Sequence, residues 1–130
     1  MIVLDASALV DLLLGRPAAA AVQNALLQEG SAHVPELADI EVLSALRRWE
    51  AGGDLTRARA GEAVDDLAQL RLVRYGHGPL LPLVWQLRDS FSPYDATYVA
   101  LAHALGGTLL TSDGRLARGA KRVVALVDLT

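Results

Sequence analysis

Short apolar runs alternate with longer helical patterns along the whole chain, and this alternation limits the folds that the sequence can adopt. Runs of three to six residues rich in leucine or β-branched residues are typical of strands, and the segments between them suit helices. Such alternation predicts a parallel sheet covered by helices on both faces. We therefore predict an α/β fold, a three-layer α/β/α sandwich with a parallel sheet of about five strands. The predicted strands span 2–4, 32–34, 71–75, 108–111 and 122–127, and the predicted helices span 6–14, 18–29, 36–51, 56–69, 80–89, 93–105 and 115–118.

The composition excludes several classes of protein. With 52% hydrophobic residues, the 130-residue chain is not disordered, and we expect a single well-filled domain over residues 1–130. The absence of cysteine excludes a disulfide framework and a thiolate metal site. A net charge of −3 indicates that any contact with nucleic acid is local. Neither a signal peptide nor a membrane span is visible, so we expect a cytoplasmic protein without membrane contact.

Three aspartates fall where strands end or helices begin. Asp5 directly follows the first predicted strand, and Asp113 lies in the turn after the strand 108–111. Asp95 lies in the first turn of the helix that leads into that same strand. The carboxyl ends of parallel strands and the N-termini of the following helices share one edge of the sheet, which is where ligands bind. We therefore expect Asp5 and Asp113 to converge at this edge, with Asp95 beside them.

Two further acids lie on the predicted helix 36–51. Glu41 borders the apolar face of this helix, next to Ser44, and no basic residue one turn further along neutralises it. Asp39 falls on the apolar side near the start of the helix and is a weaker candidate.

Each of the four stronger acids also has a purely structural interpretation. Asp5 is suited to cap the helix that follows it, and Asp113 is suited to a turn before a glycine. Asp95 falls three residues after Ser92, where an acidic side chain completes a capping box. Glu41 can be a solvated helix residue.

The combination of four carboxylates at one sheet edge favours a metal site. At about 4 Å and an effective dielectric constant near 20, each pair of unit charges costs roughly 4 kcal/mol. Several such pairs approach the whole stability of a small domain, roughly 5–15 kcal/mol. Either some acids are protonated or a cation lies among them. Oxygen ligands without cysteine or paired histidine suit Mg²⁺ or Mn²⁺, and these ions support phosphodiester chemistry.

The acids lie in motifs that resemble, in order and spacing, those of PIN-domain ribonucleases, and most closely those of VapC toxins of bacterial toxin–antitoxin modules. The resemblance extends from residue 2 to about residue 127. The four motifs are VLDASALVDLLL, ELADIEVLSALRR, SPYDATYVALA and LLTSDGRLA.

The resemblance implies a metal-dependent endoribonuclease with a PIN-like fold. It assigns catalysis and metal binding to Asp5, Glu41, Asp95 and Asp113, and it makes Ser7 a helper that orients a carboxylate or a water. It further implies Mg²⁺ or Mn²⁺ as cofactor, an RNA substrate and a homodimer. A cognate VapB-like antitoxin is expected to inhibit the toxin by inserting a segment into the acidic site. Any contact with operator DNA is then indirect, through the antitoxin.

A basic segment follows Asp113 directly and contains no acid. It is a candidate for steering an RNA backbone toward the site, although a solvated helix face is the commoner meaning of such a run. Its basic residues are Arg115, Arg118, Lys121 and Arg122.

Two other functions are compatible with an acid after the first strand. One is a phosphatase or phosphotransfer domain of the aspartyl-phosphate type. A haloacid-dehalogenase-like phosphatase has a second aspartate two residues after the first, where this chain has Ser7, and the lone Lys121 fits a receiver domain poorly. The other is a non-catalytic binding module in which the acids serve only as caps.

Overall fold

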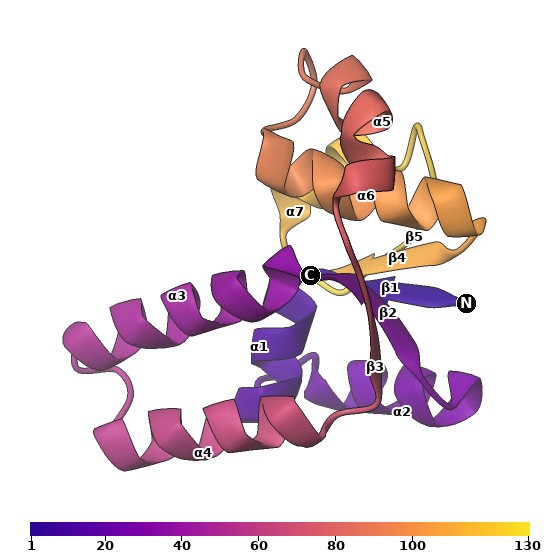
Figure 1. The fold of residues 1–130 in the computed structure, drawn as a ribbon. Coiled ribbons are helices and arrows are strands. Elements are labelled where there is room, and N and C mark those ends of the chain that lie inside the picture. Colours follow the sequence, from indigo (N-terminus) through magenta and orange to yellow (C-terminus); the bar gives the residue numbers. More distant parts are fainter.

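The computed structural model describes residues 1–130 and contains a five-stranded parallel sheet. The strand order is β3-β2-β1-β4-β5, with β1 in the centre (Figure 1). Every neighbouring pair of strands is parallel, which confirms the predicted sheet. The strands are β1 (Ile2–Leu4), β2 (Ala32–Pro35), β3 (Leu72–Tyr75), β4 (Thr108–Thr111) and β5 (Ala125–Asp128).

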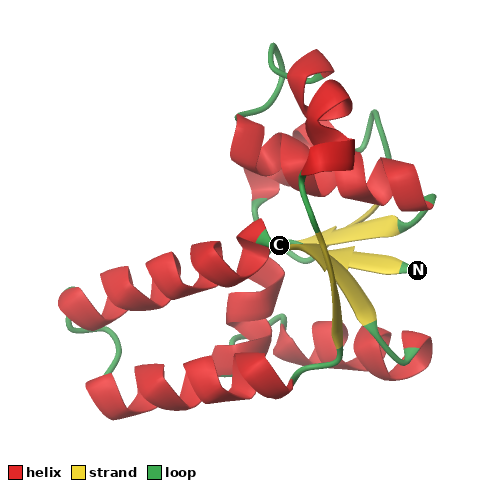
Figure 2. Ribbon diagram, viewed as in Figure 1, coloured by secondary structure: helices red, strands yellow, loops and turns green.

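Helices cover both faces of the sheet, which confirms the three-layer prediction (Figure 2). α5, α6 and α7 lie on one face, α1 and α2 lie on the other, and α3 and α4 form a hairpin that extends away from the sheet (Figure 1). The fifth helix is shorter than the predicted 80–89 and follows a 3-10 turn, η1 (Gly78–Leu80). The helices are α1 (Ala6–Leu14), α2 (Ala19–Glu29), α3 (Leu37–Ala51), α4 (Arg57–Gln69), α5 (Leu81–Gln86), α6 (Pro93–Leu105) and α7 (Gly114–Ala120). None of them is long and apolar enough to cross a membrane.

The central strand β1 is buried on both faces, and its sequence reflects this. Ile2, Val3 and Leu4 are all buried, with no alternation of polar and apolar residues. A parallel strand between two helical layers has this pattern because neither of its faces meets water. The edge strands β3 and β5 are largely exposed. The core therefore lies along β1, β2 and β4, and β1 carries the chain from the core directly to Asp5.

Two glycines end helices at the positions that the sequence predicts. Gly15 closes α1 and Gly106 closes α6, both with φ in the left-handed region, at 65° and 61°. A residue with a side chain is strained in that conformation, whereas glycine is not. The turn after Gly106 leads directly into β4. Gly106 therefore ends α6 just before the strand that precedes Asp113.

The start of the last strand differs from the prediction. The apolar run 122–127 predicts a strand throughout, but β5 begins only at Ala125. The amides of Val123 and Val124 both donate to the carbonyl of Ala120, at 2.9 and 3.0 Å. These local bonds close the end of α7, so the first β-branched residues form a turn instead of joining the sheet.

The sheet changes its direction of winding between β1 and β4. After β1 the chain moves outward through β2 to β3, and it then returns to the other side of β1 as β4 and continues to β5. A crevice opens beyond the carboxyl ends of the strands at such a switch point. Asp5 follows β1 and Asp113 follows β4, so both lie at this crevice.

The first turn of α3 is capped by a side chain from a distant part of the chain. Neither Glu36 nor any other nearby residue provides a side-chain cap, and the amide of Leu37 donates instead to Nε2 of His77, at 3.0 Å. The imidazole must present an unprotonated Nε2 to accept this bond. His77, which follows β3, therefore fixes the start of the helix that carries Glu41.

We predict that His77→Ala destabilises the protein by about 1 kcal/mol, because the loss of a helix cap typically costs that much. Urea unfolding at neutral pH measures the effect. His103→Ala is the matched control, since His103 is exposed on α6 and makes no side-chain hydrogen bond. Equal stabilities of the two variants would show that the cap contributes nothing.

Candidate active site

Asp5 is a buried carboxylate held by three donors at the end of β1. Its side chain is 4% exposed. Oδ1 accepts hydrogen bonds from Ser7 Oγ at 2.7 Å and from the amide of Ala8 at 2.9 Å, and Oδ2 accepts one from Thr111 Oγ1 at 2.6 Å. Asp5 thus caps α1, as its structural interpretation predicts, and it also connects α1 to the end of β4. The Ser7 hydroxyl donates to this carboxylate, which is the geometry expected of a residue that orients it.

Burial raises the pKa of the Asp5 carboxyl to about 6, from an ordinary value of 3.8. The hydrogen bonds from Thr111, Ala8 and Ser7 lower it but do not offset the desolvation, and the charge of Asp113 raises it further. The Asp5 carboxylate is therefore in an unfavourable state near neutral pH unless positive charge approaches it.

Asp113 is the N-cap of α7 and lies in the same region as Asp5. Its Oδ1 accepts hydrogen bonds from the amides of Arg115 and Leu116, at 3.0 and 3.2 Å. Its own amide donates to Thr111 Oγ1 at 3.0 Å. Thr111 therefore contacts both aspartates, donating to the carboxylate of one and accepting from the backbone of the other.

Asp95 is placed by a helix cap in which its own side chain takes no part. Ser92 Oγ accepts the amide of Asp95 at 3.2 Å, but the Asp95 carboxylate makes no return bond to the Ser92 amide, so the capping box is incomplete. The carboxylate is half-buried and lies 3.9 Å from a guanidinium nitrogen of Arg115. Burial and the charge of Asp113 raise the pKa of Asp95, and Arg115 partly opposes this.

Glu41 is held by a tyrosine from the opposite helical layer. The hydroxyl of Tyr98, on α6, donates to Glu41 Oε1 at 2.5 Å, and Tyr98 is only 2% exposed. Burial, the hydrogen bond to Glu41 and the charges of Glu41 and Asp5 together raise the pKa of Tyr98 far above its usual value. The Tyr98 hydroxyl therefore stays protonated and lies where both carboxylates act on it.

The four acids form a continuous electrostatic group, but not a ready-made metal site. The charge of Asp113 acts on Asp5 and on Asp95, and the charges of Asp5 and Glu41 act on Tyr98. No three histidine, aspartate or glutamate side chains already lie in an arrangement that could hold a metal ion. The available donors are carboxylate and hydroxyl oxygens, which fit Mg²⁺ or Mn²⁺ in chemical type.

Comparisons with known proteins identify the family of this chain. The PIN domain family profile matches residues 2–122. The chain belongs to the PIN-domain family. It is 47% identical over 116 residues to Ribonuclease VapC1 of Mycobacterium tuberculosis, covering 88% of this chain and 87% of the relative. Ribonuclease VapC3 of the same organism is 43% identical over 117 residues, covering 90% of this chain and 85% of the relative. The crystal structure of PAE2754 from Pyrobaculum aerophilum has a TM-score of 0.74 at 23% identity, covering 98% of this chain and 83% of that one.

These matches confirm the predicted resemblance and the predicted fold class. The PIN domain profile includes Asp5, Glu41, Asp95 and Asp113 within its matched range. The likeness to PAE2754, at 23% identity, concerns the fold alone.

Asp39 does not join the acids of this PIN domain. Its carboxylate accepts two hydrogen bonds from the guanidinium of Arg74, at 2.7 and 3.0 Å. This bidentate ion pair connects α3 to the edge strand β3, away from Asp5 and Asp113. The contact with Asp39 raises the pKa of Arg74. The weaker sequence candidate is therefore a structural residue.

Sequence reasoning missed two polar residues near the site, Thr111 and Asp11. Thr111 is fully buried, and its signal was a polar residue at the end of the apolar strand TLLT, between two candidate acids. Asp11 is buried on α1, where its carboxylate pairs with Arg16 at 3.1 Å and accepts a hydrogen bond from Ser112. Nothing in the spacing of Asp11 distinguishes it from an ordinary polar residue of α1.

The basic residues after Asp113 surround the start and end of α7. Arg115 is 80% exposed and reaches toward Asp95, whereas Arg118, Lys121 and Arg122 are exposed and make no ion pair. Most of this positive charge is therefore free to meet a negatively charged partner.

We predict that Asp5→Asn stabilises the metal-free protein at pH 7 but not at pH 4. The pKa of Asp5 in the folded protein lies above its ordinary value. The protonated carboxyl therefore contributes its full stability below pH 3.8, and this contribution is lost as the pH rises through about 6. Asparagine does not ionise and keeps its contribution at pH 7. This shift of the Asp5 pKa corresponds to a loss of folding free energy between pH 4 and pH 7 of roughly 3 kcal/mol at most. Urea unfolding in EDTA at both pH values measures it, with Asp65→Asn on α4 as an exposed control. If the Asp5→Asn variant and the unmodified protein differ in stability by the same amount at both pH values, the ionised Asp5 carboxylate does not destabilise the fold.

We predict that Tyr98→Phe destabilises the protein by about 1–2 kcal/mol, because it removes a buried donor to a charged acceptor. Urea unfolding is again the measurement. Tyr94→Phe is the matched control, since Tyr94 is on the same helix but is 60% exposed and makes no side-chain hydrogen bond. If the two variants are equally stable, the Glu41 contact carries no energy.

Proposed function

We propose that this PIN domain is a VapC-like toxin, a metal-dependent endoribonuclease that hydrolyses RNA phosphodiester bonds at the carboxyl edge of its sheet. The main support is the position of Asp95. Its carboxylate is not used by the helix cap that positions it, and it lies within reach of the charge of Asp113. A protein whose acids served only as caps would have no need of this arrangement. The 43–47% identity to proteins named Ribonuclease VapC supports RNA as the substrate.

We assign the cation, Mg²⁺ or Mn²⁺, to Asp5, Glu41, Asp95 and Asp113. The chemistry that such an ion supplies when bound is the activation of water and the stabilisation of negative charge on phosphate oxygens. Ser7 and Thr111 orient the Asp5 carboxylate by donating to its two oxygens. Tyr98 orients Glu41 in the same way, from the opposite face of the sheet. The chain thus holds two of its four acids with hydroxyl donors, which keep a carboxylate in place without neutralising it.

The exposed basic residues next to the site are suited to the RNA backbone. Asp113 caps the first turn of α7, and four basic residues lie on this helix or directly after it: Arg115, Arg118, Lys121 and Arg122. Positive side chains beside a catalytic edge concentrate phosphate there without base specificity. They compensate locally for a chain whose net charge is −3.

Under this proposal the partners are an RNA substrate and a cognate VapB-like antitoxin that blocks the acidic edge. Assembly as a homodimer, and contact with DNA only through the antitoxin, belong to the same proposal. The support for the antitoxin is the identity to VapC1 and VapC3, together with an acidic crevice that a basic segment of a partner could occupy.

We predict that Asp95→Asn keeps the fold but reduces RNA cleavage at least 100-fold, because it removes a carboxylate from the site. Cleavage of total RNA by the purified protein with Mg²⁺ or Mn²⁺ measures the activity, and EDTA should abolish it in the unmodified protein. Asp65→Asn, an exposed change on α4, serves as the matched control and should cleave normally. Full activity of the Asp95 variant, or cleavage that resists EDTA, would rule out the proposed mechanism.

A further inference from the structure

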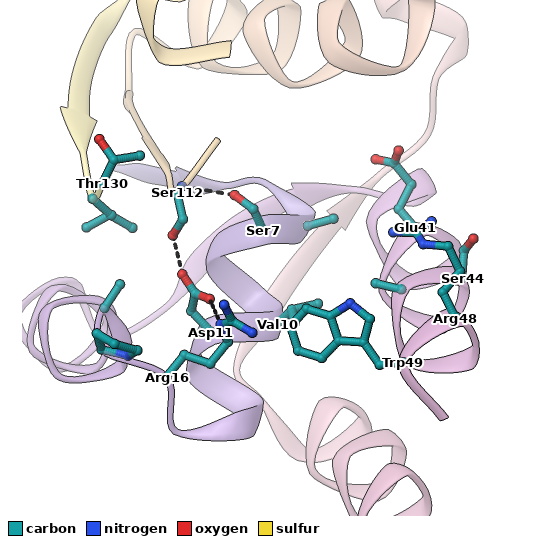
Figure 3. Close-up of a pocket in the computed structure, with 15 residues that line it drawn as sticks. Ser7, Val10, Asp11, Arg16, Glu41, Ser44, Arg48, Trp49, Ser112 and Thr130 are labelled. Atoms are coloured by element: carbon teal, nitrogen blue, oxygen red, sulfur yellow. Dashed lines mark hydrogen bonds and ion pairs between the residues drawn. The ribbon is translucent and has the colours of Figure 1, made fainter. Parts of the chain in front are cut away.

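A separate pocket opens beside the carboxylate edge, between α1 and α3. Its volume is about 580 Å³, within the range of sites for small ligands. Ser7 and Glu41 lie in its wall, whereas Asp5, Asp95 and Asp113 do not. Figure 3 shows Glu41 and Ser7 on the side of the pocket that faces the sheet edge, with Trp49 and Arg16 further away. The pocket therefore includes one of the four acids, Glu41, and none of the other three.

One face of α3 presents unpaired donors to this pocket. Glu41, Ser44 and Arg48 follow one another at helical spacing along that face, as Figure 3 shows. Seven residues of helix place the backbone of Arg48 roughly 10 Å from that of Glu41. Arg48 makes no ion pair and no side-chain hydrogen bond, and neither does Ser44. Both are exposed, so their donors are free for a ligand.

The other charged groups in the pocket are already occupied. Arg16 pairs with Asp11 at 3.1 Å, and its guanidinium lies over the ring of Trp49, 4.5 Å from the centroid. Ser112 donates to Asp11, and Glu41 accepts from Tyr98. Arg48 is consequently the one cation in the pocket wall that makes no ion pair, and its guanidinium can bind an anionic group such as a phosphate.

The remaining wall is apolar and held in place by its neighbours. Val10 is buried on α1, and Ala45 and Trp49 are partly buried on α3, where the stacked Arg16 fixes the indole. A site with an apolar wall, a free guanidinium and a free hydroxyl matches a nucleotide, whose base has flat apolar faces and whose phosphate is charged. Because the pocket adjoins Glu41, a strand that reaches the acids can place a neighbouring nucleotide in it.

We propose that this pocket binds one nucleotide of the RNA strand next to the scissile phosphate, with Arg48 and Ser44 contacting its phosphate and the wall of Val10, Ala45 and Trp49 contacting its base. This inference rests on the proposed ribonuclease function. It makes the pocket a determinant of where the RNA is cut, in addition to the acids that carry out the cut.

The test compares Arg48→Ala with Arg47→Ala. The two arginines are adjacent and exposed on the same helix, but only Arg48 lines the pocket. With a fluorogenic RNA oligonucleotide, Arg48→Ala should raise KM about tenfold and change kcat less than twofold, since the loss of one charge-assisted hydrogen bond corresponds to roughly that factor. Arg47→Ala should leave both constants unchanged.

A binding measurement separates this inference from the nuclease proposal. In an Asp95→Asn background, which does not turn over, Arg48→Glu should weaken binding of the same oligonucleotide more than Arg47→Glu does. If the unmodified protein cleaves RNA but the two arginine variants behave alike in both assays, the nucleotide pocket is refuted while the nuclease proposal stands. Unchanged RNA binding by Arg48→Glu combined with lost binding of a protein partner would assign the pocket to that partner and also refute the proposal. If the unmodified protein does not cleave RNA at all, the proposed function itself fails.

Discussion

The burial of a carboxylate at the end of the central strand is the constraint on which the rest of this structure depends. β1 is apolar on both faces and leads straight from the core to Asp5, so this charge cannot reach water without breaking the end of the strand. An isolated buried charge is costly, and proteins tolerate it only with donors or a counterion. Here the three donors come from α1 and β4, and they join the two elements that surround the crevice.

The other three acids are also positioned by donors or by a nearby cation, and each has a different partner. Asp113 uses backbone amides of α7, Glu41 uses the hydroxyl of Tyr98, and Asp95 has only a distant guanidinium. Each support positions a carboxylate, but none cancels its charge completely. The domain therefore contains electrostatic repulsion that is relieved either by protons or by a cation. This explains why burial and neighbouring acids raise the pKa of Asp5 and Asp95 together.

Much of the fold was predictable from local patterns, because strands and helices in this chain differ clearly in length and end at glycines such as Gly15 and Gly106. The positions of Asp5 and Asp113 followed from the rule that parallel strands end at one edge. The contacts of Asp39 and Glu41 could not be predicted, since their partners, Arg74 and Tyr98, lie 35 and 57 residues away. The start of β5 was mispredicted because hydrogen bonds to the end of α7 outweighed β propensity.

Contacts along its length attach the hairpin of α3 and α4 to the rest of the domain. His77 and Arg74, both from the segment of β3, hold the first turn of α3, while the turn at Gly52 and Gly53 is exposed and far from the sheet (Figure 1). Nearer the tip, Arg16 stacks over Trp49 on α3, and Arg59 on α4 donates to the carbonyl of Leu13 on α1. Because the exposed turn at Gly52 and Gly53 takes no part in these contacts, a change of chain length there leaves the attachments that position Glu41 intact.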